Sequence, residues 1–182
     1  MLPQRRRLFV GCEGESEQGY VALLARLAEA ARLGVHLDAV LLQPGGGDPL
    51  ALVERAAAYA VQRSLRRGNY ECRFVLLDRD KHGQTPERDS RIAAIAESAR
   101  LHLIWQQPCH EALLLRHLEG CSQLRPPTTP IAIEQLRQRW AGYEKATPAA
   151  RLADRLDRPA LARAAQVEPD LAVLLTTIGL IP

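Results

Sequence analysis

Short apolar runs alternate with segments of helix length over residues 7–118, and this alternation limits the available folds more than any other feature of the 182-residue chain. Buried strands are predicted at residues 7–12, 35–42, 70–77 and 101–106, and helices at residues 17–33, 48–67, 87–100 and 109–118. Strands that alternate with helices of this length form βαβ units, whose strands are parallel. The sequence therefore predicts an α/β fold with a mostly parallel sheet of about four strands and helices on both faces.

Capping and turn residues mark where two of these helices begin and end. Ser16 is the expected N-cap of the first helix, and Gly34 is expected to close it. Asp48 and Pro49 stand in the favoured order for the N-cap and the first position of the second helix. The preceding Gly45–Gly47 are interpreted as a flexible turn, because the Gly-Lys-Ser/Thr of a phosphate-binding loop does not follow.

The pattern changes after Gly120, where no further strand is predicted. A cluster of prolines over residues 126–130 indicates a linker, and later prolines separate short helical stretches. We therefore predict an α/β domain over residues 1–120 and a helical C-terminal extension over residues 121–182.

Composition is typical of a globular protein. The hydrophobic fraction of 47% and the charged fraction of 25% exclude a disordered or collagen-like chain. No apolar run reaches the roughly 18 residues that cross a bilayer, and Met1 to Val10 lacks the apolar stretch of a signal peptide. We therefore expect a cytoplasmic protein with no membrane partner. The net charge of +3 is too small to identify a nucleic-acid-binding protein, although it allows a local basic surface.

The four cysteines are expected to be free thiols. They form no Cys-x-x-Cys pair, and the cytoplasm is reducing. An alternative is a zinc site made of Cys109, His117 and Cys121, but this spacing matches no common structural site and lacks a fourth ligand. His117 lies six residues from Glu111, so a straight helix turns the two side chains about 120° apart. The alternative is therefore that His117 is not a site residue but a histidine packed in the core.

Acidic residues follow the predicted strands at the point where each strand ends. They are Glu13, Glu15 and Glu17 after the first strand, Asp78 and Asp80 after the third, and Glu111 after the fourth. In an open α/β sheet the ligand site lies at the carboxyl ends of the strands. The strand period of two places Asp78 and Asp80 on the same side, with Arg79 turned away, if extended backbone persists that far.

Carboxylates crowded at one sheet edge repel one another unless a cation neutralises them. Their oxygen atoms suit Mg²⁺ or Mn²⁺, which neutralise phosphate charge and activate water in phosphoryl transfer. The sequence therefore predicts a Mg²⁺ or Mn²⁺ site that includes Asp78 and Asp80. The alternative is that the acids are helix caps and solvated loop charges. Glu15 and Glu17 are explained equally well by the dipole of the helix that they begin.

Basic side chains offer candidate contacts for nucleic-acid phosphates. They are Arg5, Arg6, Arg7, Arg66 and Arg67, together with His82 close to the two aspartates. Beside an acidic metal site, such arginines would bind the nucleic-acid backbone. The alternative is that the arginines only keep the surface soluble and that His82 is a polar loop residue.

Four motifs in order resemble the RloB-like proteins, small Toprim-like proteins encoded beside bacterial restriction or phage-defence loci. The motifs are Cys12-Glu-Gly-Glu-Ser-Glu17 with Tyr20, Asp78-Arg-Asp80, Pro108-Cys-His-Glu111 through His117, and Tyr143-Glu-Lys145. The glutamate-glycine pair after a strand and the later Asp-x-Asp also resemble the Toprim superfamily of topoisomerases, primases and OLD-type nucleases. The sequence departs from the family pattern at Lys81, Gln107, His110 and Leu113, where an acid, an asparagine, an aromatic residue and a tryptophan are expected.

The resemblance implies a metal-dependent nuclease that cleaves phosphodiester bonds of DNA or RNA in bacterial phage defence. It implies that Glu13 is a general base or metal ligand, that Asp78 and Asp80 are metal ligands, and that Glu17 and Glu111 complete the acidic site. A partner ATPase or restriction subunit is also implied. The alternative from another class is a non-catalytic Toprim-like subunit that binds nucleic acid or serves in sensing or assembly.

Overall fold

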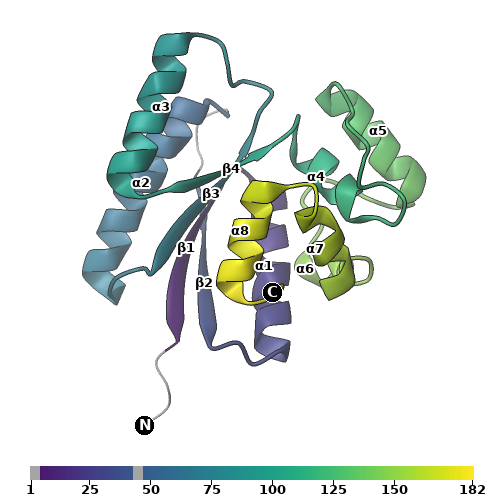
Figure 1. Cartoon of the computed structure of the whole chain (residues 1–182), viewed down its shortest axis with the longest axis horizontal. Helices are drawn as coiled ribbons and strands as arrows, with labels where there is room; N and C mark the ends of the chain where they lie inside the picture. The colour runs from purple at the N-terminus through teal and green to yellow at the C-terminus, as the bar shows by residue number, and fades with distance from the viewer. Residues whose placement is uncertain (1–4, 43–46) are drawn as a thin grey trace.

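The computed structural model describes residues 5–42 and 47–182 and contains a sheet of four parallel strands (Figure 1). The strands are β1 (Arg6–Cys12), β2 (Val35–Leu41), β3 (Cys72–Asp78) and β4 (His102–Gln106). Their order across the sheet is β2-β1-β3-β4. The predicted α/β fold with a mostly parallel sheet is confirmed.

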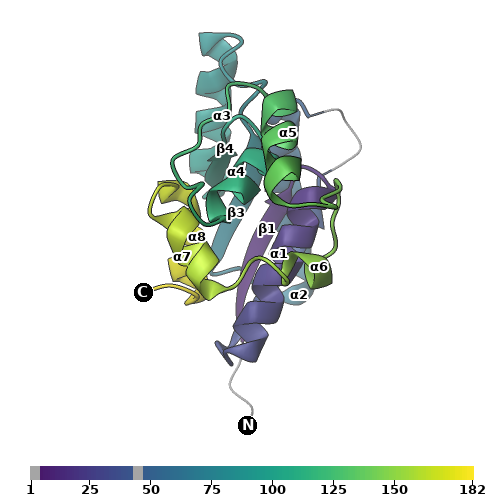
Figure 2. The same ribbon diagram turned by 90° about the vertical axis from the view of Figure 1, so that its right-hand side faces the viewer.

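Helices cover both faces of the sheet. In chain order they are α1 (Glu15–Ala30), α2 (Pro49–Arg67), α3 (Pro86–Ala99), α4 (His110–His117), α5 (Thr129–Arg139), α6 (Ala149–Leu152), α7 (Arg158–Ala165) and α8 (Pro169–Ile178). Helices α2 and α3 lie side by side on one face, while α1 and α8 cover the other (Figures 1 and 2). Helix α5 packs against α4, and α6 packs against α1. None of the helices in the described parts of the chain is long and apolar enough to span a membrane.

The strands are apolar along their length because both faces of the sheet are covered. Leu8 and Val10 of β1 point into the cluster that contains α1, whereas Phe9 between them points into the cluster that contains α2 and α3. A parallel strand buried on both sides shows a continuous apolar run instead of alternation. This is the pattern that made the strands recognisable in the sequence.

The strand order places a switch point between β1 and β3. The chain passes from β1 to β2 through α1 on one face, and then crosses back beyond β1 to β3 through α2 on the opposite face. At such a point the connections after two neighbouring strands lead to opposite faces and leave a crevice at the carboxyl ends. Glu13 directly follows β1, and Asp78 ends β3, so both acids lie at this crevice.

The start of α1 differs from the prediction. Gly14, and not Ser16, is the N-cap, and the Glu17 side chain accepts a hydrogen bond from the Gly14 N–H (3.0 Å). A glutamate at the third helical position thus satisfies the N–H of the cap residue. The Ser16 hydroxyl instead accepts a hydrogen bond from the Ala146 N–H (3.0 Å).

The end of α1 also differs from the prediction, whereas the start of α2 agrees with it. Helix α1 stops at Ala30, and Gly34, with φ of +58°, lies in the connection to β2. Asp48 is the N-cap of α2 and Pro49 is its first residue, as predicted. Of the predicted turn at Gly45–Gly47, residues 45 and 46 lie outside the described residues.

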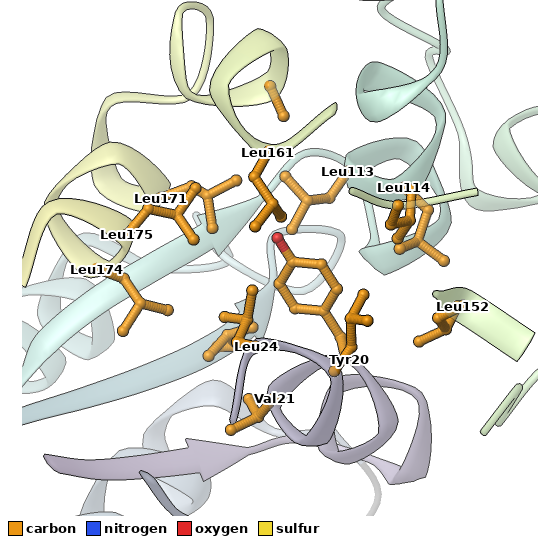
Figure 3. Packing of buried hydrophobic residues seen from close by; sticks show 14 of the residues in the cluster. Tyr20, Val21, Leu24, Leu113, Leu114, Leu152, Leu161, Leu171, Leu174 and Leu175 are labelled. Carbon is orange, nitrogen blue, oxygen red and sulfur yellow. The ribbon is translucent and has the colours of Figure 1, made fainter. Parts of the chain in front are cut away.

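The helices beyond residue 120 share the core of the sheet. Leu161, Leu171 and Leu175 are fully buried in the same cluster as Tyr20 and Leu113 (Figure 3). Helix α8 lies against β4, and α7 lies against α4. The boundary between residues 1–120 and 121–182 stays a prediction, and no strand is found among residues 121–182.

Candidate active site

An acidic cavity of about 430 Å³ lies at the switch point of the sheet. Four of the predicted site residues line it: Glu13, Glu17, Asp78 and Glu111. They come from the loop after β1, the first turn of α1, the end of β3 and the first turn of α4. The parallel topology therefore brings together acids that are far apart in the sequence.

Main-chain N–H groups hold three of these carboxylates in place. The Asp78 N–H donates to Glu13 Oε2 (2.8 Å), and the His110 N–H donates to Asp78 Oδ1 (2.9 Å). The Gly14 N–H donates to Glu17 Oε2. Hydrogen bonds to ionised groups are among the stronger ones in proteins. The carboxylates are thus fixed by the ends of the strands and helices themselves.

Burial and mutual repulsion both disfavour the ionised acids. Burial, followed by the charges of Glu17, Glu13, Glu111 and Asp80, raises the pKa of Asp78 to about 9. Burial is also the main cause that raises the pKa of Glu13, while the Asp78 N–H and Lys81 act in the opposite direction. Near neutral pH, Asp78 therefore keeps its proton unless a cation compensates the neighbouring charges.

Asp80 lies at the margin of the site and does not line the cavity. The strand ends at Asp78 and a turn follows, in which the His82 N–H donates to the Arg79 carbonyl (3.1 Å). Strand alternation therefore does not place Asp80 on the same side as Asp78. Its side chain is exposed and lines a separate hollow, although its charge still raises the pKa of both Asp78 and Glu13.

Sequence reasoning missed Gln106, which connects the acids to one another. Gln106 ends β4 beside Asp78 of β3 and is fully buried. Because carboxylates only accept hydrogen bonds, the Gln106 amide nitrogen faces Asp78 Oδ1 (3.0 Å) and Glu17 Oε1 (3.1 Å), and its oxygen accepts from His110 Nδ1 (2.8 Å). The available signal was a polar residue at the end of a strand that is otherwise apolar.

Glu111 is contacted by residues from the C-terminal extension. Burial and the nearby charge of Glu111 raise the pKa of the Tyr143 hydroxyl, and Lys145 Nζ lies 3.7 Å from Glu111 Oε1. Lys145 also lines the cavity. The acidic site is therefore built from both predicted parts of the chain.

Comparison with known families agrees with the order of the motifs. The family model described as RloB-like protein matches residues 8–172, from β1 into α8. The chain belongs to the RloB-like family. No curated protein and no solved structure matches it. The part of the chain that matches the RloB-like family contains every residue that lines the acidic cavity.

The arginines at residues 5–7 lie at the opposite end of β1 from the acids of this RloB-like protein. Arg6 begins β1 and Glu13 follows its last residue, which separates the two by roughly 20 Å of extended chain. Arg6 pairs with Glu71 (3.1 Å), and Arg7 pairs with Asp38 (3.8 Å). These arginines are therefore not beside the acidic site, and their predicted contact with nucleic acid stays a prediction.

The other predicted basic contacts also lie outside the cavity lining. Arg66 and Arg67 are exposed in the last turn of α2. The His82 ring packs against Trp105, with 4.4 Å between ring centroids, and His82 Nε2 lies 3.4 Å from Asp89 Oδ1. Their role in binding nucleic acid likewise stays a prediction.

His117 is a packed histidine. It is fully buried, its Nδ1–H donates to the Leu113 carbonyl (2.8 Å), and its Nε2 accepts from the Tyr20 hydroxyl (2.9 Å). The four cysteines are free, as predicted. Within residues 5–42 and 47–182, no three His, Cys, Asp or Glu side chains are already arranged to hold a metal ion, so the zinc alternative gains no support.

The chemistry of the acidic cavity fits a hard divalent cation. Its lining supplies carboxylate oxygens, which Mg²⁺ and Mn²⁺ prefer, together with the imidazole of His110. Burial, followed by the charges of the neighbouring acids, raises the pKa of Asp78, and a bound cation would oppose both causes. Because no three of these acids, within the described ranges, are already arranged to hold a metal ion, the side chains would have to rearrange to share one ion.

Gly47 is the described residue of the glycine turn, and it packs against Glu13. Its φ is +62°, and a Cβ atom there would lie 2.8 Å from Glu13 Oε1 and 2.9 Å from Lys81 Nζ.

Gly47→Ala is therefore expected to lower the free energy of unfolding by about 1 to 2 kcal/mol, because of the left-handed backbone and the displaced side chains. Urea unfolding measures this change. Gly83→Ala, with φ of +82° and nothing within 4 Å, is the matched control for the backbone cost alone, and an equal loss in both variants would contradict the contact.

Proposed function

We propose that this RloB-like protein is a metal-dependent nuclease of the Toprim type that hydrolyses phosphodiester bonds. The observation that supports this most is the convergence of Glu13, Glu17, Asp78 and Glu111 in one cavity at the switch point of a parallel sheet. Open α/β sheets bind their ligands at that place. The order of Glu-Gly after β1 and Asp-x-Asp at the end of β3 is the order that the Toprim resemblance implies.

In this proposal Asp78 and Glu13 are the principal residues that hold Mg²⁺ or Mn²⁺, with Asp80 at the margin. The ion neutralises phosphate charge and makes bound water more acidic. Glu13 accepts the proton of the attacking water, and its raised pKa suits a general base. Glu17 and Glu111 would hold a second ion, while Gln106 fixes the orientation of Asp78 and Glu17.

We extend the proposal to the setting of the reaction. Membership of the RloB-like family, together with the resemblance to proteins encoded beside restriction loci, supports a role in phage defence. A partner ATPase or restriction subunit would then recruit or regulate the nuclease. Both statements rest on the family and not on a contact in the structure.

The experiment that tests the nuclease uses labelled single-stranded RNA, transfer RNA, single-stranded DNA and duplex DNA. Cleavage is expected with Mg²⁺ or Mn²⁺ and is expected to stop with EDTA, because the reaction needs the ion. Product formation is followed on denaturing gels. Binding of these nucleic acids with no cleavage under either metal would favour the alternative described next.

A second candidate is a non-catalytic subunit that binds nucleic acid or a partner through the same cavity. It is favoured by the absence, within the described ranges, of a preassembled group of three metal ligands. Metal affinity separates the two candidates. A nuclease at a hundredfold excess of Mn²⁺ over its dissociation constant gains about 2.7 kcal/mol of stability, whereas a subunit without a metal site gains none.

A further inference from the structure

The segment of residues 143–147, here called the strap, forms one wall of the acidic cavity. We propose that the strap presents Lys145 as a residue that binds the phosphate backbone of a nucleic acid at the cavity. The inference rests on the proposed function, because it names a substrate contact of the same site. It also assigns the C-terminal extension a role in substrate binding, which neither the strands nor the Asp-x-Asp motif indicates.

Contacts on both sides of Lys145 fix the strap. On the N-terminal side, the Tyr143 side chain is buried, which raises the pKa of its hydroxyl, and it lies close enough to Glu111 of α4 for that charge to raise the pKa further. On the C-terminal side, the Ala146 N–H donates to Ser16 Oγ of α1 (3.0 Å). The strap is thus held by the two helices that carry Glu111 and Glu17, so the position of Lys145 is coupled to the position of the acids.

The contact that follows Lys145 leaves no space between the strap and α1. A Cβ atom at Gly19 would lie 2.8 Å from the main-chain oxygen of Thr147. Ala146 adopts φ of +58°, a left-handed conformation that is unfavourable for a residue with a side chain. Such a conformation persists where the surrounding contacts fix it, and the bond from the Ala146 N–H to Ser16 is one of these contacts.

Lys145 itself remains available although its neighbours are anchored. Its side chain is 61% exposed, and its Nζ is 3.7 Å from the buried carboxylate of Glu111. At this distance and exposure the ion pair is weak. A phosphate that enters the cavity can therefore draw the ammonium away from Glu111 without breaking a contact that the fold needs.

The choice of lysine at this place agrees with a phosphate ligand. Of the 24 basic side chains only Lys81 and Lys145 are lysines, and all others are arginines. Lys145 lies beside Glu111, and Lys81 lies close enough to Glu13 to lower its pKa. A lysine is a compact charge on a flexible stem and binds phosphate as a point charge. Both lysines of the chain are thus beside carboxylates of the proposed active site.

The experiment measures binding with cleavage excluded. Fluorescence anisotropy follows labelled single-stranded RNA, transfer RNA and duplex DNA in EDTA across a series of salt concentrations. Lys145→Gln is expected to weaken binding several-fold and to reduce the slope of log affinity against log salt by about 1, the effect of one lost phosphate contact. Lys145→Arg keeps the charge and should keep the slope.

Two further variants separate the lysine from its surroundings. Arg26→Gln removes an exposed charge from α1 away from the cavity and should leave the slope unchanged. Gly19→Ala keeps the lysine but displaces the strap, so it should reduce the slope as Lys145→Gln does. Melting temperatures confirm that each variant is folded.

The proposal is overturned if Lys145→Gln binds with the wild-type slope, or if the wild type binds none of the three nucleic acids. These outcomes are distinct from failure of the nuclease. Binding that depends on Lys145 without any metal-dependent cleavage would retain the phosphate contact and reject the nuclease. Cleavage that depends on Asp78 with binding indifferent to Lys145 would do the reverse.

Discussion

Asp78→Asn is expected to lower the cleavage rate at least a hundredfold and, at the same time, to stabilise the metal-free protein at pH 8. The amide is an uncharged and poorer ligand, and the stabilisation that a catalytic metal gives is worth several kcal/mol, or at least about a hundredfold in rate. The fold itself does not need the negative charge. The asparagine side chain keeps an oxygen that can accept the His110 N–H, which Asp78 Oδ1 accepts in the wild type.

The direction of the stability change follows from the pKa of Asp78. Its folded value of about 9 lies above the ordinary value of 3.8, so between these limits the unfolded chain has lost a proton that the native protein retains. The native state then binds more protons than the unfolded state, and stability falls as pH rises through this window. Asparagine does not titrate, so the variant does not lose this stability as pH rises. The advantage of the variant is therefore absent below pH 3.8 and largest at and above pH 9.

Urea unfolding of both proteins in EDTA at pH 5 and pH 8 measures this advantage, and gel assays with Mn²⁺ measure cleavage. Asp80→Asn is the matched control, because it removes the same charge from an exposed turn outside the cavity. We expect it to change stability by no more than about 0.5 kcal/mol, as is usual at the surface. A less stable Asp78→Asn protein at pH 8 would show that the carboxylate is a structural group and would remove the case for an ion there.

The sequence is sufficient to predict the sheet and the two acids at its switch point. Glu13 and Asp78 each follow a continuous apolar run, and parallel strands end at one edge, so their meeting needs only the alternation of strands and helices. The same logic, applied to the other strand end, would have placed Arg5 to Arg7 away from the acids. These arginines lie at the start of β1, so they are at the opposite edge.

Contacts that depend on distant segments could not be predicted. Asp80 lies outside the cavity because β3 ends at Asp78 and a turn follows, and the apolar run alone does not mark the residue at which strand alternation stops. The contact between Ala146 and Ser16 spans most of the chain. The sequence of β4 alone does not indicate a contact between Gln106 and the acids, because that contact forms only when β4 pairs with β3 beside Asp78.

The second large effect concerns the core and not the cavity. His117 is expected to make the fold sensitive to acid, because it is fully buried and hydrogen-bonded to the Tyr20 hydroxyl and the Leu113 carbonyl. Burial lowers the pKa of His117 from the ordinary 6.5 to about 4. Both ring nitrogens are used by the neutral form, so a proton on Nε2 would reverse the bond and make the Tyr20 hydroxyl oxygen the acceptor, and it would place a charge in the core.

The sign here is opposite to that of Asp78. Between pH 6.5 and pH 4 the unfolded chain binds a proton at His117 that the native protein refuses, so stability falls as pH decreases through this window. The difference between the ordinary pKa of 6.5 and the native pKa of about 4 corresponds to a loss of about 3 kcal/mol in the free energy of unfolding once the pH is below both values. In the wild type, the contribution of Asp78 partly cancels this slope, because the same decrease in pH relieves its penalty.

Removing Asp78 from the titration isolates the histidine. Asp78→Asn and the double variant Asp78→Asn, His117→Phe are unfolded in urea at steps between pH 7 and pH 4. Phenylalanine keeps a ring in the core but loses the hydrogen bonds, so the double variant starts at a lower stability at pH 7. Its stability should then change less with pH than that of Asp78→Asn, because no proton enters at position 117. Parallel curves for the two proteins would mean that a group other than His117 causes the acid sensitivity.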